Sequence, residues 1–192
     1  YGTYPVSIFK NEDICFAIYG GWTRCKSVPF DVSLGIGFSE DGGITFKKRF
    51  RGPILSSSLD EPFVITSPKI RYFYNKWYLT YTAGCRWIKD TDGRPEIIYK
   101  LRMATSDDLM NWTLLNKNLV ADKLGELEAQ ACGDIFWDGN KFNMHFCYRE
   151  ALDFRSNKKN SYKIGYCSST DLHNWNRDDS KIDLDISTSG WD

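Results

Sequence analysis

Short runs of apolar and aromatic residues, separated by clusters of Asn, Asp, Gly and Ser, follow one another along the 192-residue chain. No stretch has apolar residues recurring every three or four positions, as one face of an α-helix would. Runs rich in β-branched and aromatic residues and bounded by turn residues are typical of consecutive antiparallel hairpins. The pattern therefore predicts an all-β fold.

One turn sequence occurs twice. SDDLMNW ends at Trp112 and STDLHNW ends at Trp175, 63 positions later. A looser copy, SEDGGITF, places Phe46 66 positions before Trp112. Two longer segments, NKWYLTYTAG (75–84) and NKFNMHFCYR (140–149), keep a step of 65. This common step predicts a structural unit repeated about three times.

Each unit has the same predicted order: a strand, a tight polar turn, an aromatic-rich strand, a longer loop, a third strand and a short fourth strand. Four antiparallel strands per repeat are typical of a β-propeller blade, so we expect about three blades, near residues 4–66, 67–131 and 132–192. An antiparallel sandwich is the alternative. The expected long loops are 20–33, 82–100 and 148–162.

The repeated turn itself suits a structural role. Asp108 and Asp171 can accept hydrogen bonds from backbone amides in a turn. Trp112 and Trp175 can pack between neighbouring blades. Three blades do not close a ring, since propellers have four or more. We therefore expect either a piece of a longer protein or self-association into a homo-oligomer that completes the ring.

Composition narrows the function. Lys and Arg together number 25, as do Asp and Glu, so no basic excess predicts nucleic-acid binding. No apolar run reaches the roughly 18 residues of a membrane span. The six cysteines form no CxxC pair, and Cys15, Cys147 and Cys167 lie in apolar runs. These features favour reduced core thiols and a cytoplasmic protein.

Candidate chemistry lies where the inner strands begin and on the long loops, which meet near a propeller axis. Carboxylates, arginines and aromatic rings together suit a sugar, and glycoside hydrolysis needs a pair of carboxyl groups. The predicted catalytic residues are Glu61, Glu128 and Asp134. The predicted substrate-binding residues are Trp22, Asp31, Asp60, Arg86, Trp87, Glu96 and Arg149.

A metal centre or cofactor is not indicated. His145 and His173 are the only histidines, and neither has a second metal ligand at a useful spacing. His145 alternates with Asn143 and Cys147 on a predicted strand, which suits a structural side chain.

Several motifs resemble those of the five-bladed β-propeller glycosidase-like proteins, which are related to the arabinanases and xylosidases of glycoside hydrolase family 43 and to the fructosidases. The motifs are GIGFSEDGGITF, DEPFVITSPKI, RPEIIYKLRMATSDDLMNW, EAQACGD, FCYRE and YKIGYCSSTDLHNW, and the resemblance covers nearly the whole chain. The likeness is greatest to glycosyl hydrolase-like relatives, some of them associated with surface polysaccharide biosynthesis.

The resemblance implies an acid on the first blade, a second acid on the next and a Glu general acid on the third. Carried over by position, Asp60 or Glu61 and Glu128 or Asp134 are the acids, and Arg149 holds a substrate or orients an acid. The chain departs from the pattern in the first predicted strand, YPVSIF, which has no carboxylate at its start. The resemblance also leaves open a central Ca²⁺, which the residues do not indicate.

These observations favour a glycoside hydrolase-like propeller that acts on an oligo- or polysaccharide. In this hypothesis Glu128 protonates the leaving oxygen and Glu61 is the base, nucleophile or stabiliser. The alternative is a non-catalytic glycan-binding module with Trp22, Trp87 and Arg149 as contacts. A third hypothesis is a scaffold that assembles by pairing of blades.

Overall fold

The computed structural model describes residues 2–185 and 187, in which the strands form three four-stranded antiparallel sheets. The first sheet contains β1 (Gly2–Asn11), β2 (Ile14–Arg24), β3 (Phe30–Ser39) and β4 (Lys47–Lys48). The second contains β5 (Ile65–Phe73), β6 (Lys76–Lys89), β7 (Pro95–Ser106) and β8 (Thr113–Leu114). The third contains β9 (Glu128–Trp137), β10 (Phe142–Glu150), β11 (Lys163–Ser169) and β12 (Asn176–Arg177). Two single 3₁₀ turns are η1 (Lys158–Asn160) and η2 (Asp179–Lys181).

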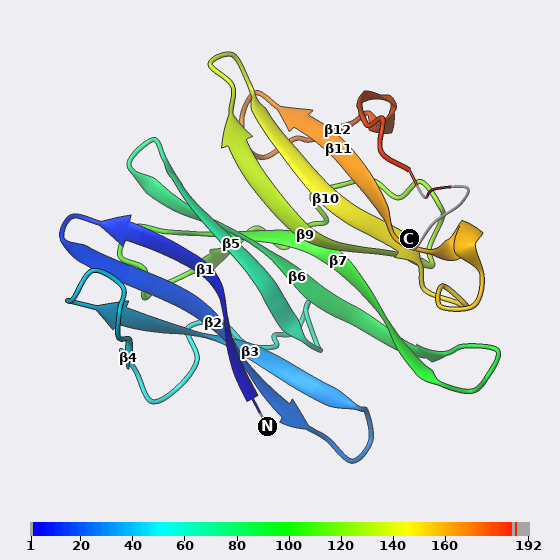
Figure 1. The fold of residues 1–192 in the computed structure, drawn as a ribbon, viewed down its shortest axis with the longest axis horizontal. Coiled ribbons are helices and arrows are strands. Elements are labelled where there is room, and N and C mark those ends of the chain that lie inside the picture. The colour runs from blue at the N-terminus through cyan, green and yellow to red at the C-terminus, as the bar shows by residue number, and fades with distance from the viewer. Residues whose placement is uncertain (1, 186, 188–192) are drawn as a thin grey trace.

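The three sheets follow one another across the molecule in chain order (Figure 1). Strand β5 contacts β1, β2 and β3 of the first sheet, and β9 contacts β5, β6 and β7 of the second. Each sheet thus packs its face against the next, with its first strand innermost. This arrangement confirms the predicted all-β propeller architecture of about three four-stranded blades. No helix among the described residues is long and apolar enough to cross a membrane.

Two apolar cores fill the spaces between the sheets. The core between the first and second sheets includes Ile18 and Leu34 from one side and Leu79 and Tyr81 from the other, all fully buried. The core between the second and third sheets includes Leu101, Met103, Met144 and Phe146. Because neighbouring residues on a strand point to opposite faces, the second sheet contributes to both cores. Its strands accordingly read as nearly continuous apolar runs.

The connections between the second and third strands differ from the prediction in two of the three sheets. Strands β2 and β3 pair as far as Arg24 and Phe30, and β6 and β7 pair as far as Lys89 and Pro95. The segments expected as long loops, 20–33 and 82–100, are therefore extended hairpins with short turns. Val32 and Ile97 are buried where these hairpins meet, which explains why pairing continues. In the third sheet the connection does include a loop with η1.

Each innermost strand carries an irregularity at the same position. The register shifts between Pro5 and Ser7 in β1 and between Thr66 and Lys69 in β5, and it shifts in β9 opposite His145 and Cys147. Ser67 and Cys132, which are 65 positions apart, have positive φ angles of 50° and 59°. Such bulges re-aim side chains, and here they lie on the strands nearest the propeller axis.

The repeated turn has the structural role that its sequence predicts. The Asp108 carboxylate accepts hydrogen bonds from the backbone amides of Met110 and Asn111 at 2.9 and 2.8 Å. The buried Ser106 hydroxyl accepts from the Leu109 amide at 2.9 Å. The same set of bonds recurs around Asp171.

The aromatic residue of each turn packs toward the preceding sheet. Trp112 contacts the core between the first and second sheets, and Trp175 contacts the core between the second and third. Their indole N–H groups donate to the carbonyls of Leu109 and Leu172. Phe46, the equivalent residue of the first sheet, instead lines an apolar hollow on that sheet's outer face and is 38% exposed.

Replacing Ser169 with Ala should destabilise the fold, because its buried hydroxyl accepts the amides of Asp171 and Leu172 at 3.2 and 3.0 Å. Leaving buried amides without an acceptor costs about 1–3 kcal/mol. Urea unfolding measures the loss, with Thr170→Ala as the exposed control. Equal unfolding free energies for the two variants would contradict the role assigned to this turn.

Stability should also fall in acid. Hydrogen bonds lower the pKa of Asp108 and Asp171, and the largest contribution comes from the backbone amide three residues later in each case. The pKa of Asp41 is also lowered, chiefly by the hydrogen bond from the Ser39 hydroxyl. The pKa of Asp in the unfolded chain is about 3.9. A carboxyl group whose pKa is lower than this in the folded protein stabilises the fold at pH values above the unfolded pKa. This stabilisation is lost as the pH falls through the folded pKa. The unfolding free energy should therefore decrease as pH is lowered below about 5.

The variant Asp171→Asn tests this pH dependence, because it keeps an acceptor for the amides but cannot be ionised. Urea unfolding at a series of acidic pH values should show a shallower decline for the variant than for the wild-type chain. An identical slope in both proteins would show that this carboxylate does not contribute to acid unfolding.

Candidate functional site

Most predicted site residues lie at one end of the sheets, which we call the proximal end: the end at which β1, β5 and β9 begin. Because the strands are antiparallel, β2, β6 and β10 end there and β3, β7 and β11 begin there. The two extended hairpins also project from this end. The topology therefore brings candidate residues from all three sheets to the same side of the molecule.

Glu61 lies just before β5 and is buried between the first and second sheets, with 1% of its surface exposed. The Tyr81 hydroxyl donates to both carboxylate oxygens, at 2.8 and 3.0 Å, and the Arg102 Nε lies 4.0 Å away. Burial raises the pKa of Glu61, with a smaller contribution from the charge of Asp60, while Tyr81 and Arg102 oppose the rise. Burial thus favours the protonated form of Glu61 more than water would.

Glu128, the first residue of β9, is fully buried between the second and third sheets. One carboxylate oxygen accepts the backbone amides of Lys123 and Leu124 at 2.8 and 2.9 Å. The other accepts Arg177 Nη1 at 2.7 Å and Gln130 Nε2 at 2.8 Å. Each oxygen therefore has two donors, which matches the capacity of an ionised carboxylate.

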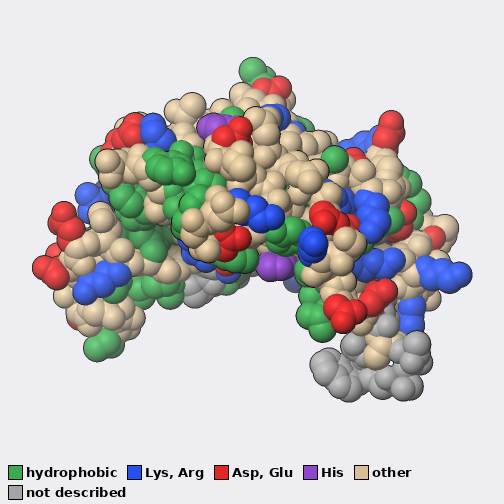
Figure 2. All heavy atoms as spheres, turned by 90° about the horizontal axis from the view of Figure 1, so that it is seen from above, with side chains coloured by type: hydrophobic (Ala, Val, Ile, Leu, Met, Phe, Trp, Pro, Cys, Tyr) green, Lys and Arg blue, Asp and Glu red, His purple; other side chains and the backbone are tan. Residues whose placement is uncertain are grey.

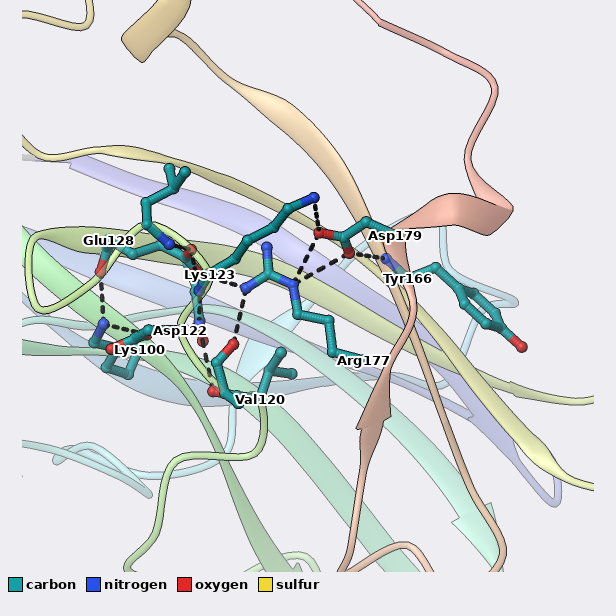
Figure 3. Close-up of polar contacts among 11 residues, drawn as sticks. Lys100, Val120, Asp122, Lys123, Glu128, Tyr166, Arg177 and Asp179 are labelled. Atoms are coloured by element: carbon teal, nitrogen blue, oxygen red, sulfur yellow. Dashed lines mark hydrogen bonds and ion pairs between the residues drawn. The ribbon is translucent and has the colours of Figure 1, made fainter.

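The contacts of Glu128 belong to a larger buried polar network (Figure 3). Lys100 Nζ from β7 reaches Asp122 at 2.6 Å and the backbone oxygen of Glu128 at 2.7 Å. Arg177 Nε contacts Asp179 at 3.0 Å, and its guanidinium lies 4.3 Å from the centre of the Tyr148 ring. The network joins the second sheet to both the inner and the outer strand of the third.

The geometry around Glu128 is that of a structural carboxylate. A general acid has to carry a proton and reach the leaving oxygen, whereas these oxygens are enclosed and face a guanidinium. The proton-donor role of Glu128 therefore stays a prediction. The contacts of its carboxylate do not favour that role.

Asp134 has different surroundings. It forms an ion pair with Arg71 of β5 at 2.6 Å, and both side chains are 40% exposed. Arg71 Nε also donates to the Ile135 carbonyl at 2.9 Å, so this pair links two neighbouring inner strands. Glu61, Glu128 and Asp134 share no partner among the described residues, so the contacts do not gather the three predicted acids into one cluster.

Glu96 and Arg149 form a third buried pair between the second and third sheets. Arg149 Nη2 lies 3.7 Å from Glu96, and the exposed Arg155 also pairs with that carboxylate. The Arg149 guanidinium lies 3.6 Å from the ring centre of Phe154 and 5.3 Å from that of Tyr99. With 2% of its surface exposed, Arg149 is enclosed by rings from both sheets.

Trp22 and Trp87 are brought together by the extended hairpins. Phe30 lies between them, with ring centres 5.9 Å from Trp22 and 5.5 Å from Trp87. Both indoles are half-buried. Asp31 bonds the amide of its neighbour Val32, while Asp60 and Arg86 are exposed at the same end.

Sequence reasoning missed the partners of these carboxylates. Arg102 could have been found from strand register, because it is paired with Tyr81 across β6 and β7. Arg177 comes two positions after the repeated Trp175, which is a weak signal. Lys100 ends the expected long loop 82–100 and Gln130 lies on the approach to an inner strand, so neither is distinguished from its neighbours until the sheets are packed together.

Other features of the surface lie away from the proximal acids. The hollow next to Phe46 has a volume of about 260 Å³ and is lined by Tyr4, Ile8, Ala17 and Tyr19 among others. Seen from above, the surface carries charges of both signs interspersed, and the outline is hollowed on one side (Figure 2). Within residues 2–185 and 187, no group of three potential ligands is placed to hold a metal ion.

Replacing Glu128 with Gln should destabilise the chain, because Arg177 would lose one of its two buried carboxylate partners and keep only Asp179. Losing a hydrogen bond to a charged group costs about 1.5–3 kcal/mol. The measurement is urea unfolding, with Glu126→Gln as control, since Glu126 is exposed two residues earlier. A Glu128→Gln variant as stable as the control would contradict the structural role of this carboxylate.

Comparison with known proteins gives partial matches. No protein-family model matches the chain. An uncharacterized protein of Mycobacterium tuberculosis is 25% identical over 187 residues, which are 97% of this chain and 58% of that protein. A β-1,2-mannobiose phosphorylase of Thermoanaerobacter sp. (strain X514) is 36% identical over 88 residues, covering 45% of this chain and 26% of the enzyme. The chain thus spans little more than half the length of the relative that it matches almost throughout.

Solved structures share the architecture at low identity. The GH32 β-fructofuranosidase of Bombyx mori has a TM-score of 0.68 at 21% identity, over 89% of this chain and 35% of that one. A structure of the GH130 mannoside phosphorylase family has a TM-score of 0.67 at 19% identity, over 91% and 48%. The chain therefore shares the fold of these structures.

Proposed function

We propose that this chain forms part of a carbohydrate-recognising propeller whose ligand binds at the proximal end, and that a β-linked mannoside is the ligand to test first. The 36% identity over 88 residues to a protein named β-1,2-mannobiose phosphorylase carries the proposal, because it exceeds the 21% and 19% identity to the two solved structures compared above. The GH130 structure adds support, since it is described as including hydrolases that target β-1,2 mannosidic linkages.

The proximal end offers groups suited to a sugar. The half-buried indoles of Trp22 and Trp87 lie close to the exposed hairpin turns, and Asp60 and Arg86 are exposed on the same side. Indole faces pack against the C–H surface of a pyranose, while carboxylate and guanidinium groups bond its hydroxyls. Arg149, which the sequence also suggests as a ligand contact, is enclosed and would act by holding the aromatic cluster in place.

Recognition is favoured over turnover because the acids are already engaged. Glu61 and Glu128 each lie between two sheets with their oxygens hydrogen-bonded. The bulges of the inner strands, which face the axis, carry Ser67 and Cys132 rather than carboxylates.

One observation favours glycoside hydrolysis as a second candidate. The raised pKa of Glu61 is what a general acid requires near neutral pH. In this version Glu61 donates a proton after the first and second sheets separate enough to admit the leaving oxygen. Self-association and a cytoplasmic location stay predictions of the sequence.

Titration calorimetry with β-1,2-mannobiose and a panel of other disaccharides tests recognition. Trp22→Ala and Trp87→Ala should each weaken binding about tenfold, since each removes a stacking surface. The control is Trp137→Ala, an exposed Trp at the opposite end of β9. Equal affinity of all three variants, or no binding to any sugar of the panel, would contradict a glycan site at the proximal end.

Turnover distinguishes the second candidate. If the chain only binds, product release from the bound sugar should be undetectable and Glu61→Gln should leave affinity unchanged. Detectable hydrolysis that disappears in Glu61→Gln and survives in Glu126→Gln would instead assign catalysis to Glu61.

A further inference from the structure

Two cysteines lie side by side at the bulge of β9. The chain's six cysteines are all within the described residues and are free thiols, and Cys132 and Cys147 occupy adjacent paired strands. In the register Cys147 faces Ala131, the residue before Cys132. Cys132 is thus one position away from the residue directly opposite Cys147. Residues placed in this way on paired strands lie within the range of Cα separations that a disulfide can bridge.

The bulge changes the register of β9 at Cys132. The register passes from His145 opposite Asp134 to Cys147 opposite Ala131, so the intervening Phe146 faces two residues of β9. Cys132 adopts a positive φ of 59° at this place and its side chain is exposed, whereas Cys147 is half-buried. The following Gly133 has no room for a side chain, because a Cβ would lie 2.8 Å from the Met144 sulfur.

The two thiols are unequal. Interaction with the neighbouring Cys147 thiol, helped by Ser67 and the charge of Lys69, lowers the pKa of Cys132 to about 6. The same interaction and burial raise the pKa of Cys147. The Cys147 thiol donates to the Ala131 carbonyl at 3.4 Å. An exposed thiolate beside a protonated thiol is the arrangement of a reactive cysteine and its resolving partner.

We propose that Cys132 and Cys147 form a redox-active pair in which Cys132 reacts with peroxides and Cys147 resolves the product to a disulfide. The Cys132 sulfur attacks one peroxide oxygen and the O–O bond breaks, giving a sulfenic acid and an alkoxide or hydroxide that takes up a proton. The Cys147 sulfur then attacks the Cys132 sulfur and water leaves. Two thiols are thereby oxidised by two electrons, and the peroxide is reduced to an alcohol or water.

The disulfide would fix β9 to β10 where β9 also contacts the second sheet. Thr80 donates to the Gly133 carbonyl at 2.7 Å, next to Cys132. Oxidation would therefore stiffen the bulge that faces the propeller axis, whether or not a sugar binds at the proximal end.

Treating the reduced, folded chain with one equivalent of hydrogen peroxide tests the pair. Two of the six thiols should be lost, and peptide mapping without reduction should find a Cys132–Cys147 cross-link that dithiothreitol removes. In Cys147→Ser the sulfenic acid should persist at Cys132 and be trapped by a 1,3-dione. Ser67 holds the equivalent positive-φ position, so Cys132→Ser is compatible with the backbone, and it should abolish the rapid loss of thiols.

Alkylation by iodoacetamide gives an independent readout with a matched control. Cys25 is also exposed, and Cys25→Ser should leave the peroxide reaction unchanged. At pH 6, Cys132 should be alkylated on the order of tenfold faster than Cys25, because its larger thiolate fraction outweighs its lower nucleophilicity. Survival of all six thiols after peroxide treatment, or alkylation of Cys132 no faster than that of Cys25, would overturn the proposal.

Discussion

The packing of one sheet face against the next is the interaction on which the rest of the structure depends. A four-stranded sheet of this size cannot bury its apolar faces alone, and each space between sheets here is filled by side chains from both neighbours. Glu61, Glu96 and Glu128 lie in these spaces, each beside an arginine. The carboxylates that look like catalytic acids in the sequence are thus placed where the sheets are held together.

Much of the fold could be predicted from the sequence because its signals are local. The turn closed by Trp112 and Trp175 depends on hydrogen bonds within a few residues, and its recurrence sets the repeat length. The extended hairpins could not be predicted in the same way. Gly, Pro and charged residues in 20–33 and 82–100 resemble loops, and only the burial of Val32 and Ile97 against the neighbouring sheet explains why pairing continues.

The candidate site was less predictable because it depends on partners distant in the chain. Position singled out Glu61 and Glu128, and the structure buries both, one just before β5 and the other at the start of β9, while their catalytic roles stay predictions. The position in the sequence did not reveal that Tyr81 and Arg102 lie beside Glu61. It also did not reveal that Arg177 lies beside Glu128. Likewise, Cys132 and Cys147 are 15 residues apart and carry no CxxC signature. Their pairing follows from a bulge that shifts the register of β9 against β10.

The central claim is that buried carboxylates at the proximal end join the sheets. A double-mutant cycle between Glu96 and Arg149 measures this directly, using urea unfolding of Glu96→Gln, Arg149→Met and the combined variant. If the pair links β7 of the second sheet to β10 of the third, the two substitutions should be non-additive, with an interaction energy of about 1–3 kcal/mol. Additive losses would show that the two side chains stabilise the fold independently and would contradict the account.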